Sequence, residues 1–129
     1  MRKALEEREA ERKDRLGRAQ KFAEKATKAL GAISVWVYGS VARGDFNLWS
    51  DVDVLLVAEN LPEHPLDRAS LLFQWAPAGV EPRGLTKAEF EKALAKKDAQ
   101  LLYALKDRVP LRDDLGLEPI LASAVRELP

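Results

Sequence analysis

Asp51 and Asp53 are the side chains best suited to chemistry, in the stretch DVDVLLVA that covers residues 51–58. Residues i and i+2 of a strand point to the same face, so in a strand these carboxylates would lie about 7 Å apart on one side. Like charges beside apolar neighbours repel each other, and a hard divalent cation that prefers oxygen ligands relieves that repulsion. The alternative is a solvent-facing strand edge or a turn, which the apolar residues that follow disfavour. The pair therefore indicates a cation site.

Gly39 and Ser40 form a second candidate because they directly follow the apolar stretch SVWVY at residues 34–38. Glycine permits a tight turn and the close approach of another group to the backbone. A helical turn beginning near Ser40 would direct free N–H groups at an anion, and the serine hydroxyl adds a donor. Two residues are a weak signal by themselves, but their chemistry suits a phosphate.

Ten residues separate Ser40 from Asp51, and Arg43 and Gly44 lie between them. A connection of this length can fold back so that the phosphate-binding turn at Gly39 and Ser40 faces the same pocket as the carboxylate pair. Two Mg²⁺ ions about 3.5–4 Å apart, bridging carboxylates and a triphosphate, can activate a hydroxyl and stabilise a leaving pyrophosphate. The spacing thus favours nucleotide chemistry.

The elements that must position these residues follow from hydrophobic spacing and turn signals. A long helix is expected over residues 2–30, polar in its first half and apolar at helical spacing from Leu16 onward. Pro82 marks the third strand as an edge strand or as one that ends its pairing early. A capping box from Thr86 to Glu89 opens a helix. Strands are expected over 34–38, 51–58, 79–85 and 109–111, and further helices over 67–75, 86–97, 98–107 and 118–128. This order predicts an α/β (α+β) domain with a small mixed β-sheet flanked by helices.

Length and composition limit the kind of protein. The chain has 129 residues, which suits one domain, here expected over 16–129 with a projecting helical segment at 1–15. The 21 basic and 21 acidic side chains cancel, although residues 1–30 carry a net +4 and the remainder −4. Cysteine is absent and His64 is the only histidine, which excludes disulfides, thiolate catalysis and multi-histidine metal sites. With no membrane-length apolar run and no signal-peptide core, we expect a cytoplasmic protein with neither membrane nor nucleic acid as partner.

The motif Gly39-Ser40, ten residues and Asp51-x-Asp53, with Arg43-Gly44 soon after the serine, resembles the DNA polymerase β-like nucleotidyltransferase superfamily. The length resembles its minimal nucleotidyltransferase branch, and the resemblance covers about residues 16–115. It implies that Gly39 and Ser40 hold the β- and γ-phosphates of a nucleotide. It also implies that Asp51 and Asp53 ligate two Mg²⁺ ions, with ATP as the co-substrate.

The same resemblance implies a third carboxylate on a later strand, for which Glu81 is the matching candidate. It would help to bind one metal ion and act as general base on the acceptor hydroxyl. The sequence departs from the family pattern here, because the residue is Glu rather than the commoner Asp and Pro82 follows it. A plain acid on an edge strand is the alternative. Arg43 could reach a phosphate, or could instead pair with Asp45.

The resemblance also implies the activity. The leading hypothesis is a Mg²⁺-dependent nucleotidyltransferase that moves AMP from ATP to a hydroxyl and releases pyrophosphate. Small members of the family accompany HEPN-domain toxins, which makes a tyrosine of such a partner the expected acceptor and the chain an antitoxin. One alternative is a binding module that neutralises the partner with weak or lost chemistry, and another is a transferase for small molecules such as aminoglycosides. A polymerase fragment is disfavoured by the acidic body, and a homo-oligomer stays open.

Overall fold

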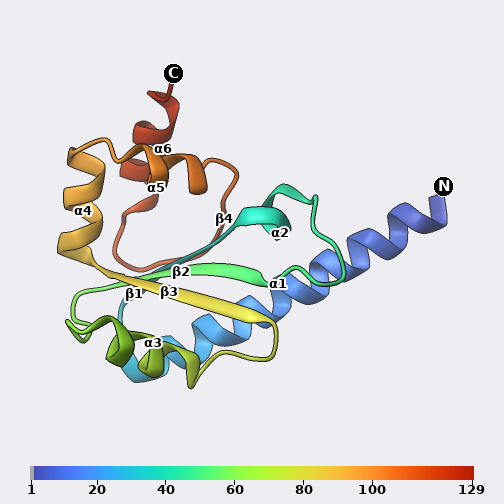
Figure 1. Ribbon diagram of the computed structural model, residues 1–129, viewed down its shortest axis with the longest axis horizontal. Coiled ribbons are helices and arrows are strands. Elements are labelled where there is room, and N and C mark those ends of the chain that lie inside the picture. Colours follow the sequence, from blue (N-terminus) through green and yellow to red (C-terminus); the bar gives the residue numbers. More distant parts are fainter. Residues whose placement is uncertain (1) are drawn as a thin grey trace.

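The computed structural model describes residues 2–129 and shows a four-stranded sheet with helices on both faces (Figure 1). The strands lie in the order β3-β2-β1-β4, with β1 antiparallel to β2 and to β4, and β2 parallel to β3. The elements are α1 (Arg2–Leu30), β1 (Ile33–Tyr38), α2 (Gly39–Arg43), β2 (Val52–Ala58), α3 (Pro65–Phe73), β3 (Val80–Thr86), α4 (Lys87–Ala95), α5 (Ala99–Ala104), β4 (Val109–Asp113) and α6 (Glu118–Arg126). The mixed sheet flanked by helices confirms the predicted fold class.

One face of the sheet is covered by α1 and α3 (Figure 1). The side of α1 that meets the sheet is made of small residues and one phenylalanine: Ala19, Phe22, Ala23 and Ala26, all fully buried. Alanines let the helix axis approach the strands closely, and Phe22 fills the space that remains. The helical spacing predicted from Leu16 onward is confirmed. The N-terminal turns of α1 extend past the edge of the sheet, but side-chain contacts with the body begin already at Arg8.

The other face is covered by α4, α5 and α6, and only in part. Trp36 of β1 stacks on Phe90 of α4, with ring centroids 5.4 Å apart, and Leu102 and Leu121 of the later helices join this second core. The capping box predicted at the start of α4 is confirmed, since Thr86 and Glu89 exchange side-chain and backbone hydrogen bonds. The covered part lies toward the carboxyl end of β2. Toward its amino end the sheet is open.

The structure decides between the two alternatives raised for Pro82. Pro82 does lie in an edge strand, but it does not end the pairing early, because β3 stays in register with β2 as far as Ala58 opposite Thr86. At an edge, every second N–H points away from the sheet, so a proline there need not remove a ladder hydrogen bond.

No helix among residues 2–129 is long and apolar enough to cross a membrane.

Asp113, the last residue of the edge strand β4, joins three elements. Its carboxylate accepts hydrogen bonds from the Ser34 hydroxyl at 2.7 Å, the Leu117 amide at 2.8 Å and the Glu118 amide at 3.0 Å. Burial by itself would raise the pKa of Asp113, but these hydrogen bonds outweigh it and hold the pKa below its usual value. The ionised carboxylate therefore ties β1 and β4 to the start of α6.

We predict that Asp113→Asn lowers the free energy of unfolding by about 1–3 kcal/mol at pH 7, because one acceptor and the charge are lost. A carboxyl whose pKa is lowered in the folded state stabilises the fold when the pH is above the ordinary aspartate pKa. This stabilisation is lost as the pH falls through the lowered, folded-state pKa. The difference from wild type should therefore shrink between about pH 5 and pH 2 in urea titrations. Asp107→Asn, at an exposed aspartate after α5, is the matched control. A deficit that persisted at pH 2 would contradict the charge argument.

Candidate active site

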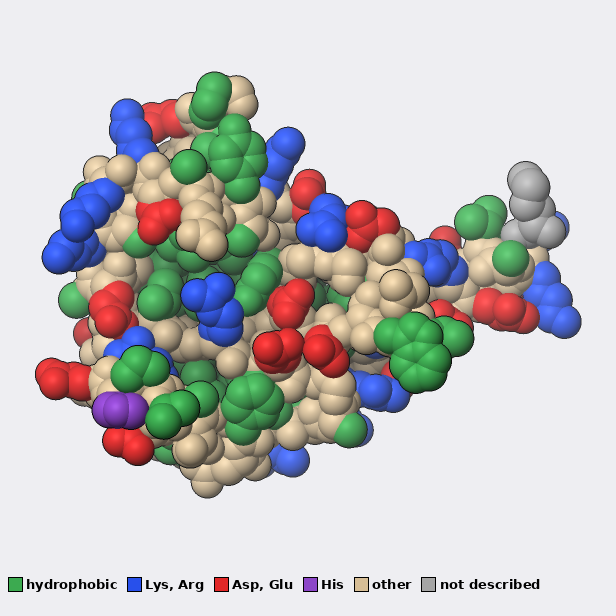
Figure 2. Space-filling view, viewed as in Figure 1, with side chains coloured by type: hydrophobic (Ala, Val, Ile, Leu, Met, Phe, Trp, Pro, Cys, Tyr) green, Lys and Arg blue, Asp and Glu red, His purple; other side chains and the backbone are tan. Residues whose placement is uncertain are grey.

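Strand register brings two of the predicted carboxylates together. Asp53 lies opposite Glu81 in the parallel pair of β2 and β3, and opposite Tyr38 in the antiparallel pair of β1 and β2. Directly opposed residues on neighbouring strands point to the same face, with Cβ atoms about 4.5–5.5 Å apart. The three side chains therefore share the open face of the sheet. Figure 2 shows acidic side chains gathered there, at the amino ends of β2 and β3.

Asp51 lies just before β2 and is exposed, two residues from Asp53. Burial raises the pKa of Asp53 above its usual value, and the negative charges of Glu81 and Asp51 raise it further. The three predicted carboxylates therefore interact electrostatically. Across residues 2–129 no set of three or more His, Cys, Asp or Glu side chains is drawn together as a closed metal site. The three carboxylates are crowded at one edge of the sheet, and a bound cation would draw them closer together.

Gly39 is held in a conformation that favours glycine. Its φ is +76°, in the left-handed region, and a Cβ atom there would lie 2.5 Å from Oδ2 of Asp53. The backbone of Gly39 thus lies directly against the carboxylate on β2. The five-residue α2 begins at this glycine, without a side-chain cap at Tyr38. The turn that carries Ser40 therefore adjoins the carboxylate of Asp53, which is the proximity that the ten-residue spacing predicted.

Arg43 is exposed, and its Nε lies 3.1 Å from the Asp45 carboxylate. The pairing alternative raised from the sequence is thus present. Its positive charge also acts on Asp53, where it opposes the rise in pKa. The ion pair is solvent-exposed, so a competing phosphate displaces Asp45 at small cost. Arg43 is near the carboxylates and available to an anionic ligand.

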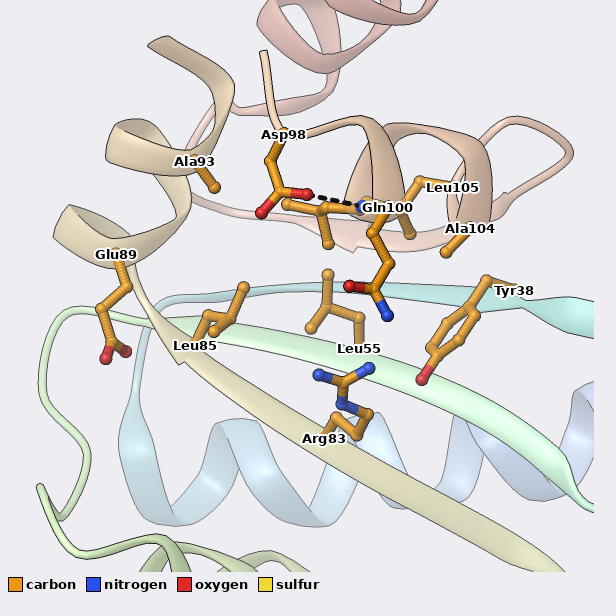
Figure 3. Close-up of a pocket in the computed structure, with 11 residues that line it drawn as sticks. Tyr38, Leu55, Arg83, Leu85, Glu89, Ala93, Asp98, Gln100, Ala104 and Leu105 are labelled. Carbon is orange, nitrogen blue, oxygen red and sulfur yellow. Dashed lines mark hydrogen bonds between the residues drawn. The ribbon is translucent and has the colours of Figure 1, made fainter. Parts of the chain in front are cut away.

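A hollow of about 250 Å³ opens beside the carboxylates on the same face (Figure 3). Its lining includes four leucines of β2, β3 and the α5 region, together with the carboxylates of Glu89 and Asp98; the leucines are Leu55, Leu85, Leu101 and Leu105. Tyr38 and Arg83 lie on the side next to Asp53 and Glu81, and Gln100 of α5 points in from above. The hollow combines an apolar floor with a few polar groups, which is the composition of a small-molecule site.

Tyr38 and Arg83 are site residues that sequence reasoning missed. Burial raises the pKa of the Tyr38 hydroxyl, while the neighbouring Arg83 guanidinium opposes that rise. Arg83 also opposes the raised pKa of Asp53. The available signal was period two in a strand, which places Arg83 on the same face as Glu81, two residues earlier. The signal for Tyr38 was its place at the end of its strand, directly before the Gly39 turn.

Unlike Trp36, which is buried in the core, Trp49 lies at the surface. Its side chain is 89% exposed, and neighbouring Leu48 is 73% exposed. Asn47 holds the turn that presents them. Its side-chain Oδ1 accepts a hydrogen bond from the Trp49 main-chain N–H at 2.8 Å, and its own main-chain N–H donates to the Ser50 hydroxyl. Both apolar side chains thus stand in solvent just before Asp51.

Comparisons with known proteins agree with this geometry. The family model described as a nucleotidyltransferase domain matches residues 18–122, so the chain belongs to that family and is a nucleotidyltransferase. A "Putative protein adenylyltransferase" of Methanocaldococcus jannaschii is 35% identical over 79 residues, covering 50% of this chain and 54% of the relative. The chain thus matches about half the length of that relative.

Two solved structures share the fold. One is described as a "putative nucleotidyltransferase" from Sulfolobus solfataricus, with 23% identity, a TM-score of 0.61, and coverage of 80% of this chain and 84% of that one. The other is described as a toxin-antitoxin with AMP-PNP, with 12% identity, a TM-score of 0.53, and coverage of 83% and 84%. At these identities the likeness concerns the fold alone.

We predict that Gly39→Ala displaces Asp53 as well as straining the backbone. Gly44 provides the matched control, because its φ is +90° but a Cβ there would meet nothing within 4 Å. Gly44→Ala should cost about 1–2 kcal/mol from the left-handed backbone alone. Gly39→Ala should cost clearly more in urea unfolding and should also weaken binding of Mg²⁺ with AMP-PNP. Equal losses in the two variants would show that the contact with Asp53 is unimportant.

A second prediction concerns charge at Asp53. Since the folded-state pKa is raised, ionisation of this carboxyl opposes folding, and stability falls as the pH rises from the ordinary aspartate value through the raised one. Without divalent cations at pH 7, Asp53→Asn should therefore raise the melting temperature by about 2–4 °C, with no gain near pH 3. Mg²⁺ should stabilise wild type more than the variant. Asp107→Asn should show neither effect, and a melting temperature lowered by Asp53→Asn would contradict the interpretation.

Proposed function

We propose that the protein transfers AMP from ATP to a hydroxyl group of a protein acceptor and releases pyrophosphate. The observation that carries this proposal is the register of Asp53 with Glu81, next to Asp51 and to the Gly39 turn. This register supports a site in which three carboxylates adjoin a turn whose backbone can approach phosphates. The family membership supports the reaction class, and the relative's name supports AMP as the transferred group.

The donor set suits Mg²⁺, which takes carboxylate oxygens and substrate phosphates as ligands. The raised pKa of Asp53 reflects crowded like charges that a divalent cation would relieve. In the proposal Asp51, Asp53 and Glu81 hold two such ions, with Glu81 completing the set from the neighbouring strand. Bound Mg²⁺ would neutralise the triphosphate and stabilise the leaving pyrophosphate.

The chain's own residues then divide the remaining work. Gly39 and Ser40 bind the β- and γ-phosphates through backbone N–H groups and the serine hydroxyl, and Arg43 adds a charge-assisted contact. Glu81, exposed on the edge strand, accepts the proton of the acceptor hydroxyl as its oxygen attacks the α-phosphorus. The apolar hollow beside Tyr38 binds the nucleoside, with the Gln100 amide available to the base.

The acceptor we propose is a tyrosine of a HEPN-domain partner, to which the protein serves as antitoxin. Support comes from the resemblance in the glycine-serine and aspartate motif, from the relative named as a protein adenylyltransferase, and from the neighbour described as a toxin-antitoxin. A tyrosine hydroxyl is a suitable nucleophile once its proton has a carboxylate to accept it. A non-catalytic antitoxin is the second candidate, favoured by the departure from the family pattern at Glu81 and Pro82.

The test is to incubate the protein with α-labelled ATP, Mg²⁺ and a purified HEPN-domain protein. Wild type should label the partner on tyrosine, whereas Asp51→Asn combined with Asp53→Asn should reduce labelling by at least about 10³-fold, because the charge that binds the ions is lost. Glu81→Gln should reduce it by about 10²–10⁴-fold through loss of the base. Glu91→Gln, at an exposed position on α4, is the control. If the double variant neutralises the partner as well as wild type, the non-catalytic function is correct.

A further inference from the structure

We propose that Arg8, Arg12 and Arg15 of α1 are positioning residues that hold the segment from Val41 to Asn47 in the geometry the active site needs. The inference rests on the proposed function, because it takes Gly39, Ser40 and Asp51 as parts of one nucleotide site. The three arginines are spaced i, i+4 and i+7, so they lie on one side of the helix. All three reach main-chain carbonyl oxygens of that segment.

Arg12 caps the carboxyl end of α2. Its Nε donates to the Val41 carbonyl at 3.0 Å and its Nη2 donates to the Ala42 carbonyl at 2.9 Å. The last carbonyls of a helix lack internal partners and attract positive charge. A helix of five residues has few hydrogen bonds of its own, so these two from outside weigh heavily. Arg12 therefore fixes the short helix that starts at Gly39.

Arg8 and Arg15 fix the chain beyond that helix. Arg8 donates to the Gly44 carbonyl at 3.0 Å and also to the Phe46 carbonyl, and its guanidinium carbon lies 4.4 Å from the centre of the Phe46 ring. The guanidinium carbon of Arg15 lies 4.6 Å from the same ring, and its Nη2 donates to the Asn47 carbonyl at 3.5 Å. Phe46 is only 2% exposed. Two cations thus hold a buried aromatic ring and the backbone on each side of it.

The clamped segment has a particular place in the site. It begins just after Ser40 and ends four residues before Asp51, so its shape sets how the phosphate turn lies relative to the first carboxylate. The same α1 helix packs Phe22 and Ala23 against the sheet that carries Asp53. The arginines therefore anchor the Val41–Asn47 segment to the same helix that packs against the sheet carrying Asp53. Preorganisation of this kind lowers the ordering cost when a ligand binds.

The test compares Arg12→Met, Arg12→Lys and Lys13→Met. Methionine keeps an unbranched stem but removes both hydrogen bonds, lysine retains a charge that reaches one carbonyl, and Lys13→Met removes the same charge from the exposed neighbouring position. We expect Arg12→Met to weaken AMP-PNP binding in the presence of Mg²⁺ about tenfold or more by calorimetry, with Arg12→Lys intermediate. Lys13→Met should stay within about twofold of wild type.

Amide hydrogen exchange supplies a readout that does not depend on nucleotide. In folded Arg12→Met, exchange at the Gly44 and Asp45 amides, which both bond to the Ser40 carbonyl, should quicken while amides of β1 and β2 keep wild-type rates. Quickening throughout the protein, or none at residues 44 and 45, would overturn the inference. Arg8→Met, at the more exposed contact, carries the same test if Arg12→Met does not fold.

The two proposals fail in different ways. If wild type does not bind AMP-PNP with Mg²⁺, the proposed function is wrong, and the exchange rates alone decide whether the arginines order the segment. If wild type binds and Arg12→Met binds equally well, the positioning role is wrong and the proposed function stands.

Discussion

The structure depends on one register, the pairing of Asp53 with Glu81 across two parallel strands. It forces two carboxylates to adjacent positions on the same face, and Asp51 adds a third charge from just before the strand. The chain tolerates this because the carboxylates lie at the amino ends of β2 and β3, at the open part of the face, where water still reaches them. The remaining strain appears as the raised pKa of Asp53. A shift of one residue in that register would send Glu81 to the opposite face and dissolve the site.

The division of the sheet explains how a small domain keeps both a core and a site. The face under α1 and α3 is apolar along its length, so it supplies most of the packing. On the other face, Leu55 and Val57 lie under α4 and α5, whereas Asp53 on the same strand stays uncovered. Along this face of β2 the side chains therefore change from charged to apolar where the helices begin to cover the strand. The hollow lies at that boundary, with leucines on one side and Tyr38 and Arg83 on the other.

Sequence reasoning predicted the local elements and the motif well because their signals are local. The period-two placement of Asp51 and Asp53, the apolar spacing of α1 and the capping box at Thr86 each depend on residues a few positions apart. Sequence reasoning did not predict the contribution of Arg83, since its meaning depends on which strand lies beside β3. It also predicted that the helical segment at residues 1–15 projects from the domain, because its residues are polar and carry no apolar stripe. The carbonyls that Arg8 and Arg12 bind are far along the chain and are invisible in any pattern of side chains.

The charge distribution takes on a different meaning once the arginines are located. The net charge of +4 on residues 1–30 balances the net negative charge of the remaining residues. Arg8, Arg12 and Arg15, however, direct their guanidinium groups at main-chain carbonyls and at Phe46. They order the motif segment without neutralising its carboxylates. Arg43 and Arg83 act directly on Asp53, and Arg43 already pairs with Asp45. Under the proposed function, a triphosphate brought to this edge would meet more negative charge than positive charge, and cations from solution would have to accompany it. In the function and the positioning role that we propose, the two tasks are separate: arginines of α1 fix the backbone, and the three carboxylates collect the metal charge that a nucleotide needs.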